Sequence, residues 1–116
     1  MNIPRADERS KEAFRSFLPD DPRVTVRPMF DNVSAFMNGN MFFGVFGNDL
    51  FVRLSDNHRK ELLKKGASLL EPVQSRPMKE YVMIPRAWWK DPETIRSWVG
   101  RSLEWASKLP AKTSRK

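Results

Sequence analysis

The stretch from Val33 to Leu54 constrains the fold more than any other part of this chain. It reads VSAFMNGNMFFGVFGNDLFVRL, which is three short apolar runs separated by an Asn-Gly-Asn and a Gly-Asn-Asp segment. Runs of aromatic, Met and β-branched residues favour strands, and Asn and Gly readily adopt the positive φ values of tight hairpin turns. The pattern therefore predicts a three-stranded antiparallel meander with strands at Val33–Met37, Met41–Phe46 and Leu50–Leu54.

The middle run of this meander offers large side chains to both faces of the sheet. Strict alternation places Phe42, Gly44 and Phe46 on one face, and Met41, Phe43 and Val45 on the other. A sheet that is apolar on both faces needs helices over one face. The other face then needs a second subunit or more protein.

Helices are predicted on either side of the meander and near the C-terminus. In residues 7–18 apolar side chains recur at three- and four-residue steps behind an acidic first turn, as in an amphipathic helix. Ser55 is a favourable N-cap for a second helix, which Gly66 ends. Asp91, with a proline after it, begins a third helix that runs to Leu109 with one broad apolar stripe.

The remaining strands are less regular. Two extended segments, 70–73 and 80–84, follow the second helix among prolines. Residues 24–30 include β-branched residues, but Pro28 lacks the amide donor of a central strand, so an edge strand or an irregular segment is expected there. The predicted fold class is α+β, in two layers with an antiparallel sheet covered by helices, in the order α-β3-α-β2-α.

A chain of 116 residues with 40% hydrophobic content suits one domain with a single core. We expect residues 1–110 to form this domain. Residues 111–116, AKTSRK, have almost nothing to pack and are expected to be a basic disordered tail.

Residues that usually carry catalysis or bind metals are scarce. The chain has no cysteine and a single histidine, His58, which excludes disulfides, thiolate nucleophiles and zinc sites built on sulfur. His58 falls in the first turn of the second predicted helix, where a structural role is expected. The glycines lie between and within strands, not before a helix as in a phosphate loop. We therefore predict no catalytic residues, no metal and no cofactor, and a protein that is not an enzyme.

No segment is typical of a targeting peptide or a membrane span. Residues 1–12 mix basic and acidic side chains and lack a continuous apolar core, and no other window approaches the roughly 18–20 apolar residues that cross a bilayer. The absence of cysteine suits a reducing compartment. A soluble cytoplasmic protein without membrane partners is expected.

Positive charge is concentrated toward the C-terminus. The net charge is +7 at pH 7, with residues 1–54 neutral overall and residues 81–116 holding eight basic against three acidic side chains. Such a balance gives salt-sensitive attraction to polyanions. In residues 86–90, RAWWK, aromatic and basic side chains interleave, as in proteins that stack on nucleic-acid bases, although indoles that close one end of a core give the same pattern. The candidate polyanion contacts are Arg86, Lys90, Arg101, Lys108, Lys112, Arg115 and Lys116.

Several phrases, taken in order, resemble the N-terminal domain of the TfoX (Sxy) family. They are Arg27-Pro28-Met29-Phe30, the Asn38-Gly39 hairpin with Met41-Phe42 after it, Leu50–Leu54, and Arg76–Tyr81 running to Ile84-Pro85. The likeness covers residues 23–105 and implies a compact α+β domain of helix, three strands, helix, two strands and helix. One departure stands out, because Asp31-Asn32 occupies the positions where the family usually has Gly-Gly.

The resemblance implies regulation, not catalysis. Larger TfoX proteins resemble regulators of DNA-uptake competence that work with the cyclic-AMP receptor protein and carry a second, C-terminal domain. We expect this chain to be a stand-alone member without that domain. The leading expectation is a non-enzymatic interaction domain of a cytoplasmic bacterial protein, acting through contacts with a partner protein or with itself as a homodimer. Two alternatives stay open: a nucleic-acid accessory protein that uses the basic residues above, and a small-molecule binder or enzyme with a pocket between sheet and helices.

Overall fold

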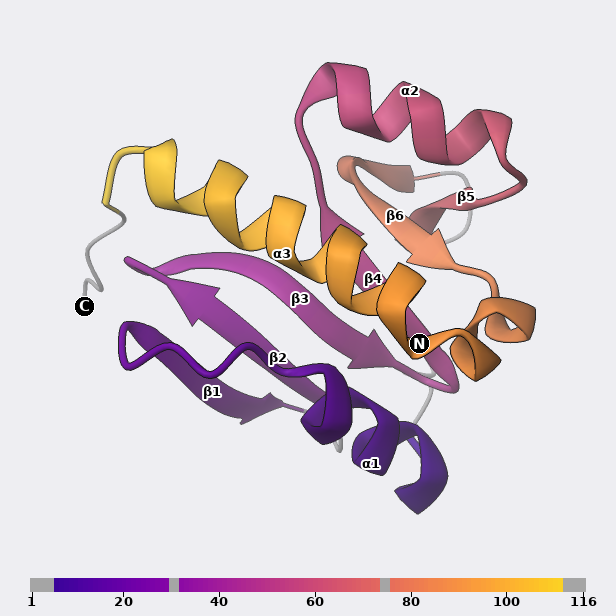
Figure 1. Ribbon diagram of the computed structural model, residues 1–116, viewed down its shortest axis with the longest axis horizontal. Coiled ribbons are helices and arrows are strands. Elements are labelled where there is room, and N and C mark those ends of the chain that lie inside the picture. The colour runs from indigo at the N-terminus through magenta and orange to yellow at the C-terminus, as the bar shows by residue number, and fades with distance from the viewer. Residues whose placement is uncertain (1–5, 30–31, 74–75, 112–116) are drawn as a thin grey trace.

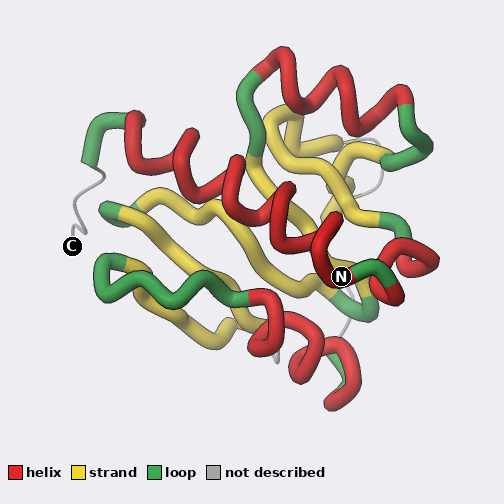
Figure 2. Tube along the Cα trace, viewed as in Figure 1, coloured by secondary structure: helices red, strands yellow, loops and turns green. Residues whose placement is uncertain are grey.

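The computed structural model describes residues 6–29, 32–73 and 76–111, and in these ranges it shows an α+β fold with the helices packed on one face of a sheet (Figure 1). The elements are α1 (Glu8–Phe17), β1 (Val24–Met29), β2 (Asn32–Met37), β3 (Asn40–Phe46), β4 (Asp49–Arg53), α2 (Asp56–Lys64), β5 (Ser68–Val73), β6 (Arg76–Ile84), the 3-10 helix η1 (Arg86–Lys90) and α3 (Pro92–Lys108). The six strands form one antiparallel sheet in the order β1-β2-β3-β4-β6-β5. Helix α3 runs along the sheet with α1 and α2 to either side of it (Figure 2).

The central meander is confirmed, and its turns use the predicted residues. Asn38 and Gly39 both have positive φ, at 52° and 81°, which is the backbone of a two-residue primed hairpin turn between β2 and β3. Between β3 and β4, Gly47 has a φ of 64°, as a type II′ turn requires at its first central residue. These turns fix the pairing of the three strands.

The sheet has four strands before α2, not three, because residues 24–29 also pair. Strand β1 lies antiparallel to β2, with Val24 opposite Met37 and Pro28 opposite Val33. It is the outermost strand, where only one side of the backbone has to be hydrogen-bonded and a proline is tolerated. The edge-strand interpretation of this segment is therefore right.

The second pair of strands is longer than the sequence indicated. Strand β6 lies beside β4, with Leu50 opposite Ile84, and β5 pairs with β6 at the other edge of the sheet. The strands begin at Ser68 and Arg76, before the expected segments. Their register shifts at two places, and such irregularities allow pairing to continue past prolines because a displaced residue makes no ladder bond.

Each α-helix begins at a side-chain cap that the sequence provides. The side chains of Asp7, Ser55 and Asp91 accept hydrogen bonds from the backbone N–H groups three residues later, which satisfies donors that the helix itself leaves unpaired. After α2, Gly66 has a φ of 113°, the conformation that favours glycine beyond a helix C-terminus. The predicted helix starts and the glycine stop are confirmed.

The buried apolar side chains form one cluster between the helices and one face of the sheet. The strands contribute Ala35, Met37, Phe42, Phe43, Val45, Leu50, Val52, Leu54, Val82 and Ile84. Phe14 of α1 stacks on Phe43 with ring centroids 4.9 Å apart. Leu62 of α2 is fully buried, and Trp98 of α3 is 4% exposed. The layer between sheet and helices is thus filled with side chains.

Strict alternation fails at Phe42. This residue belongs to the helix-side core together with its neighbour Phe43, although alternation places the two on opposite faces. The register of β2 with β3 shifts between Ala35 and Phe36, so that Phe36 pairs with Met41 and Ala35 with Phe43. Phe42 is left without a partner as the extra residue of a β-bulge, which reorients its side chain.

A buried hydroxyl joins α3 to the sheet where β3 and β4 separate. Pairing of these strands ends at Phe43 and Val52. Just beyond that pair, Ser102 Oγ lies 2.6 Å from the carbonyl oxygens of Phe42 and Arg53 and accepts the N–H of Arg53 at 3.2 Å. Ser102 is fully buried. Its hydroxyl therefore satisfies backbone groups of β3 and β4 at the point where the two strands no longer bond to each other directly.

Candidate functional site

Within the described residues, one face of the sheet carries no helix, and we call it the open face. Side chains on it alternate with those of the core: Ser34 and Phe36 from β2, Gly44 and Phe46 from β3, Phe51 and Arg53 from β4, and Tyr81 and Met83 from β6. Phe36, Phe46, Tyr81 and Met83 are half-buried. The open face is therefore a broad aromatic surface, as the sequence predicted for one side of the sheet.

Phe51 lies at the centre of this face and needs Gly44 beneath it. Its side chain is 3% exposed although it is outside the core cluster. A Cβ at Gly44 would lie 2.6 Å from Cζ of Phe51 and 2.7 Å from Oγ of Ser34. Gly44 thus lets an aromatic ring lie flat on the backbone of a neighbouring strand.

Tyr81 extends the aromatic surface and crosses β4. Its ring packs edge-on against Phe51 at a centroid distance of 5.8 Å, and its hydroxyl donates to the carbonyl oxygen of Met41 at 3.2 Å. Burial raises the pKa of the Tyr81 phenol above its ordinary value of 10.0, because water no longer stabilises the phenolate.

Two arginines lie over aromatic rings of the open face. The guanidinium of Arg27 is 5.1 Å from the centroid of Phe36, and that of Arg53 is 5.6 Å from Tyr81. Arg53 Nε also donates to Glu80 Oε1 at 2.9 Å. Aromatic residues and arginine are the types enriched in the centres of protein interfaces.

Both edge strands of the sheet contain a proline. Pro28 lies in β1 and Pro72 in β5. A proline removes an amide donor from the row of groups that a further strand would bond. Each edge strand therefore has one backbone donor fewer for pairing with a further strand.

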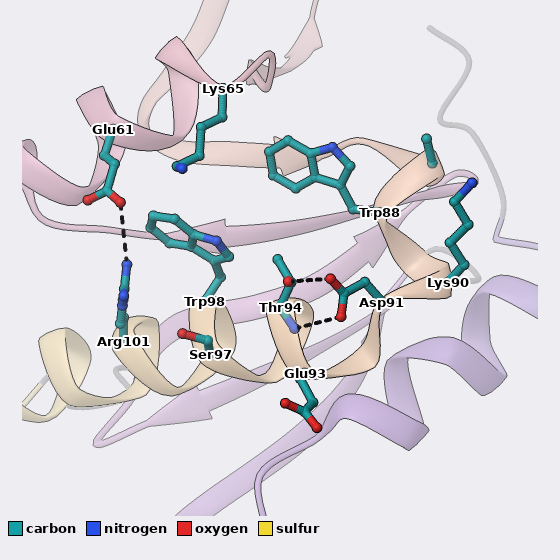
Figure 3. Close-up of a pocket in the computed structure, with 11 residues that line it drawn as sticks. Glu61, Lys65, Trp88, Lys90, Asp91, Glu93, Thr94, Ser97, Trp98 and Arg101 are labelled. Carbon is teal, nitrogen blue, oxygen red and sulfur yellow. Dashed lines mark hydrogen bonds and ion pairs between the residues drawn. The ribbon is translucent and has the colours of Figure 1, made fainter.

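A second candidate surface consists of η1 and the two grooves on either side of it, and we call this surface the η1 ridge. An open groove of about 630 Å³ lies between α2, η1 and α3. In Figure 3 the indoles of Trp88 and Trp98 lie on its walls, and Lys65 reaches into it from α2. The guanidinium of Arg101 lies 4.5 Å from the centroid of Trp98, and His58 packs edge-on against the same ring at 6.2 Å.

A second groove of about 520 Å³ lies on the other side of the ridge, toward α1. Trp89 lines it, and Arg86 stacks over that indole at 4.7 Å. Ala87 and Lys90 line both grooves. The consecutive tryptophans of η1 therefore face two adjacent depressions that meet at the ridge.

The structure brings together some of the predicted polyanion contacts and separates others. Lys90 and Arg101 line the first groove, and Arg86 and Lys90 line the second. Lys108, near the end of α3, lines neither of these two grooves. Lys112, Arg115 and Lys116 lie outside the described residues. Lys65 is not among the residues predicted from the sequence, because only the packing of α2 against the rest of the chain brings it to the groove that Trp88 also lines.

Among the described residues no group of three or more His, Asp or Glu side chains could hold a metal ion. No helix in the described part of the chain is both long enough and apolar enough to cross a bilayer.

The sequence profile of the TfoX N-terminal domain matches residues 12–106, which run from α1 to near the end of α3. The chain belongs to the TfoX N-terminal domain family. Comparison with curated proteins gives no match. The family membership confirms the resemblance drawn from the ordered motifs, and both the open face and the η1 ridge lie within the matched part of this TfoX domain.

The departure from the family motif has a structural counterpart. Asp31 lies outside the described residues, but Asn32, which replaces the second glycine, is 7% exposed. Its Oδ1 accepts the backbone N–H of Gly47 at 2.9 Å. In this TfoX domain the asparagine side chain therefore stabilises the turn between β3 and β4.

Proposed function

We propose that this TfoX N-terminal domain is a non-enzymatic regulatory domain of the bacterial cytoplasm that acts through protein contacts, and that its open face associates with a second copy of the chain. The observation that carries the proposal is the aromatic surface around Phe51, over which no helix of the described part of the chain packs. Soluble proteins rarely leave a contiguous apolar surface of this kind without a partner.

A second copy suits the open face because a twofold axis would place the same aromatic surface on both sides of the contact. Phe36, Phe46 and Tyr81 of one copy would then pack against the open face of the other. Twofold dimers are the commonest oligomers, and two sheets packed face to face make a stable sandwich.

The proline-containing edges support a contact through the face. A dimer that continues the sheet would need a row of free amide donors on β1 or β5, and Pro28 and Pro72 interrupt both rows. The non-enzymatic part of the proposal is supported by His58, the single histidine of the chain, which packs against Trp98.

Sedimentation velocity from about 1 to 100 μM tests the proposal, because that range brackets the micromolar affinities of modest interfaces. We expect the natural chain to dimerise, and Phe36→Lys or Met83→Lys to be monomeric because each places a charge in the apolar contact. Val26→Lys is the matched control, since Val26 is exposed and lies opposite the core residue Ala35, on the other side of the sheet from the open face, and should leave the dimer intact. Circular dichroism confirms that each variant is folded.

A natural chain that stays monomeric at the highest concentration refutes self-association. So does a folded Phe36→Lys variant that dimerises as strongly as the natural chain.

A further inference from the structure

The η1 ridge combines aromatic rings and cations on both of its sides. Trp88 faces the first groove and Trp89 the second. Arg86 stacks on Trp89, and Arg101 stacks on Trp98 at the far wall of the first groove. Alternating rings and cations of this kind bind nucleic acid through its bases and its phosphates.

Three acidic residues line the first groove, and two of them, Asp91 and Glu61, are occupied within the protein, whereas the side chain of Glu93 points away from Trp88 and Lys65 in Figure 3. Asp91 accepts hydrogen bonds from the backbone N–H and the hydroxyl of Thr94, and Glu61 pairs with Arg101 at 3.8 Å. In contrast, Lys65 and Lys90 form no ion pair with any residue in the described ranges. Two ammonium groups beside exposed indole surface therefore remain available to an anionic ligand.

We propose that the η1 ridge is a binding site for single-stranded nucleic acid. The strand crosses the ridge at Lys90, which lines both grooves. One base enters the first groove against Trp88, a neighbouring base enters the second against the Arg86 guanidinium that lies over Trp89, and Lys65 and Lys90 contact the phosphates. The groove volumes, about 630 and 520 Å³, lie in the range of sites that take small planar ligands.

The geometry favours a single strand over other polyanions. The indoles of Trp88 and Trp89 are half-buried in groove walls, so a ring must leave its own stack and enter a groove to reach them. Paired bases in a duplex cannot do so. An acidic peptide would pair with the lysines but leave the indole of Trp88 without a stacking partner.

Fluorescence anisotropy with a labelled oligothymidylate of about 12 nucleotides tests the proposal, since ordinary single-strand sites span roughly 4–16 nucleotides. Lys65→Ala/Lys90→Ala should weaken binding by about 25-fold at about 0.1 M salt and lower the slope of log K against log salt by about 1.4, the effect of two lost phosphate contacts. The matched control is Lys64→Ala/Lys108→Ala, which removes the same charge from exposed positions of α2 and α3 outside the grooves and should change binding less than about twofold.

Trp88→Leu separates stacking from charge. It should weaken binding by about 5- to 150-fold without changing the salt slope, and its fold is verified by circular dichroism. Overturning results are an absence of binding at low salt, an equal loss in the control pair, an unchanged affinity in a folded Trp88→Leu variant, equal affinity for duplex DNA, or displacement by polyglutamate at equal charge. The η1 ridge shares no residue with the open face, so Phe36→Lys should bind the oligonucleotide normally.

Discussion

Replacement of Gly44 by alanine probes how the open face is built. The glycine lies in β3, and its φ is not positive, so its backbone conformation is accessible to any residue. Glycine matters here because it has no side chain. A Cβ at this position would lie 2.6 and 2.9 Å from two ring carbons of Phe51. Real side chains do not tolerate such contacts, and the ring would have to move away from the sheet.

The magnitude follows from two opposing terms. Forcing extra volume into a packed site costs about 1–3 kcal/mol, whereas alanine lowers the entropy of the unfolded chain and recovers about 0.4–1 kcal/mol. The Ser34 hydroxyl, 2.7 Å from the added Cβ, can rotate and contributes little. Gly44→Ala should therefore destabilise the fold by about 1–2 kcal/mol, a fall in Tm of roughly 5–10 °C.

Urea unfolding followed by tryptophan fluorescence measures this change, with two controls. Gly100→Ala, where a Cβ meets nothing within 4 Å, should instead stabilise α3 by about 0.5–1 kcal/mol. In a Phe51→Leu background the ring atoms are gone, so Gly44→Ala should cost less than about 0.5 kcal/mol. The reasoning is refuted if Gly44→Ala is as stable as the natural chain, or if its cost is the same with leucine at position 51.

Two further predictions concern polar groups around the sheet. Ser102→Ala leaves the carbonyl groups of Phe42 and Arg53 without the hydroxyl. It should lower the free energy of unfolding, measured with urea, by about 1–3 kcal/mol. A change below about 0.5 kcal/mol would show that other groups satisfy these carbonyls. Tyr81 is the single tyrosine of the chain, so absorbance at alkaline pH reports its ionisation alone. Because burial raises the pKa of the folded phenol above the ordinary value of 10.0, the associated stability is complete below pH 10 and is lost as the pH rises through the folded pKa; a Tyr81 pKa at or below 10.0 in the folded protein contradicts this.

Local signals in the sequence predicted the elements that depend on local chemistry. The hairpins follow from the positive φ that Asn38, Gly39 and Gly47 adopt, and the helix starts follow from caps such as Asp91. Pro28 correctly indicates that residues 24–29 are not a central strand. It does not show whether they pair, because a residue without an amide donor is tolerated both in an edge strand and in an irregular segment.

Features that depend on distant residues could not be read in the same way. The bulge at Phe42 arises from the residue register of β2 with β3. The alternation of side chains within β3 alone does not reveal this register. The η1 ridge is a similar case. Trp88 and Lys90 were visible as an aromatic and basic cluster, but Lys65 joins them only through the packing of α2 near η1.

The prolines of the two outer strands also limit how large an assembly can become. A sheet with free edges can add copies without end and grow into fibres. Here Pro28 and Pro72 would interrupt lateral growth, and the proposed twofold contact would cover the open face of both copies, leaving none of it for a third copy. Association of this chain should therefore stop at a closed pair, even at the high local concentrations at which strand-rich proteins polymerise.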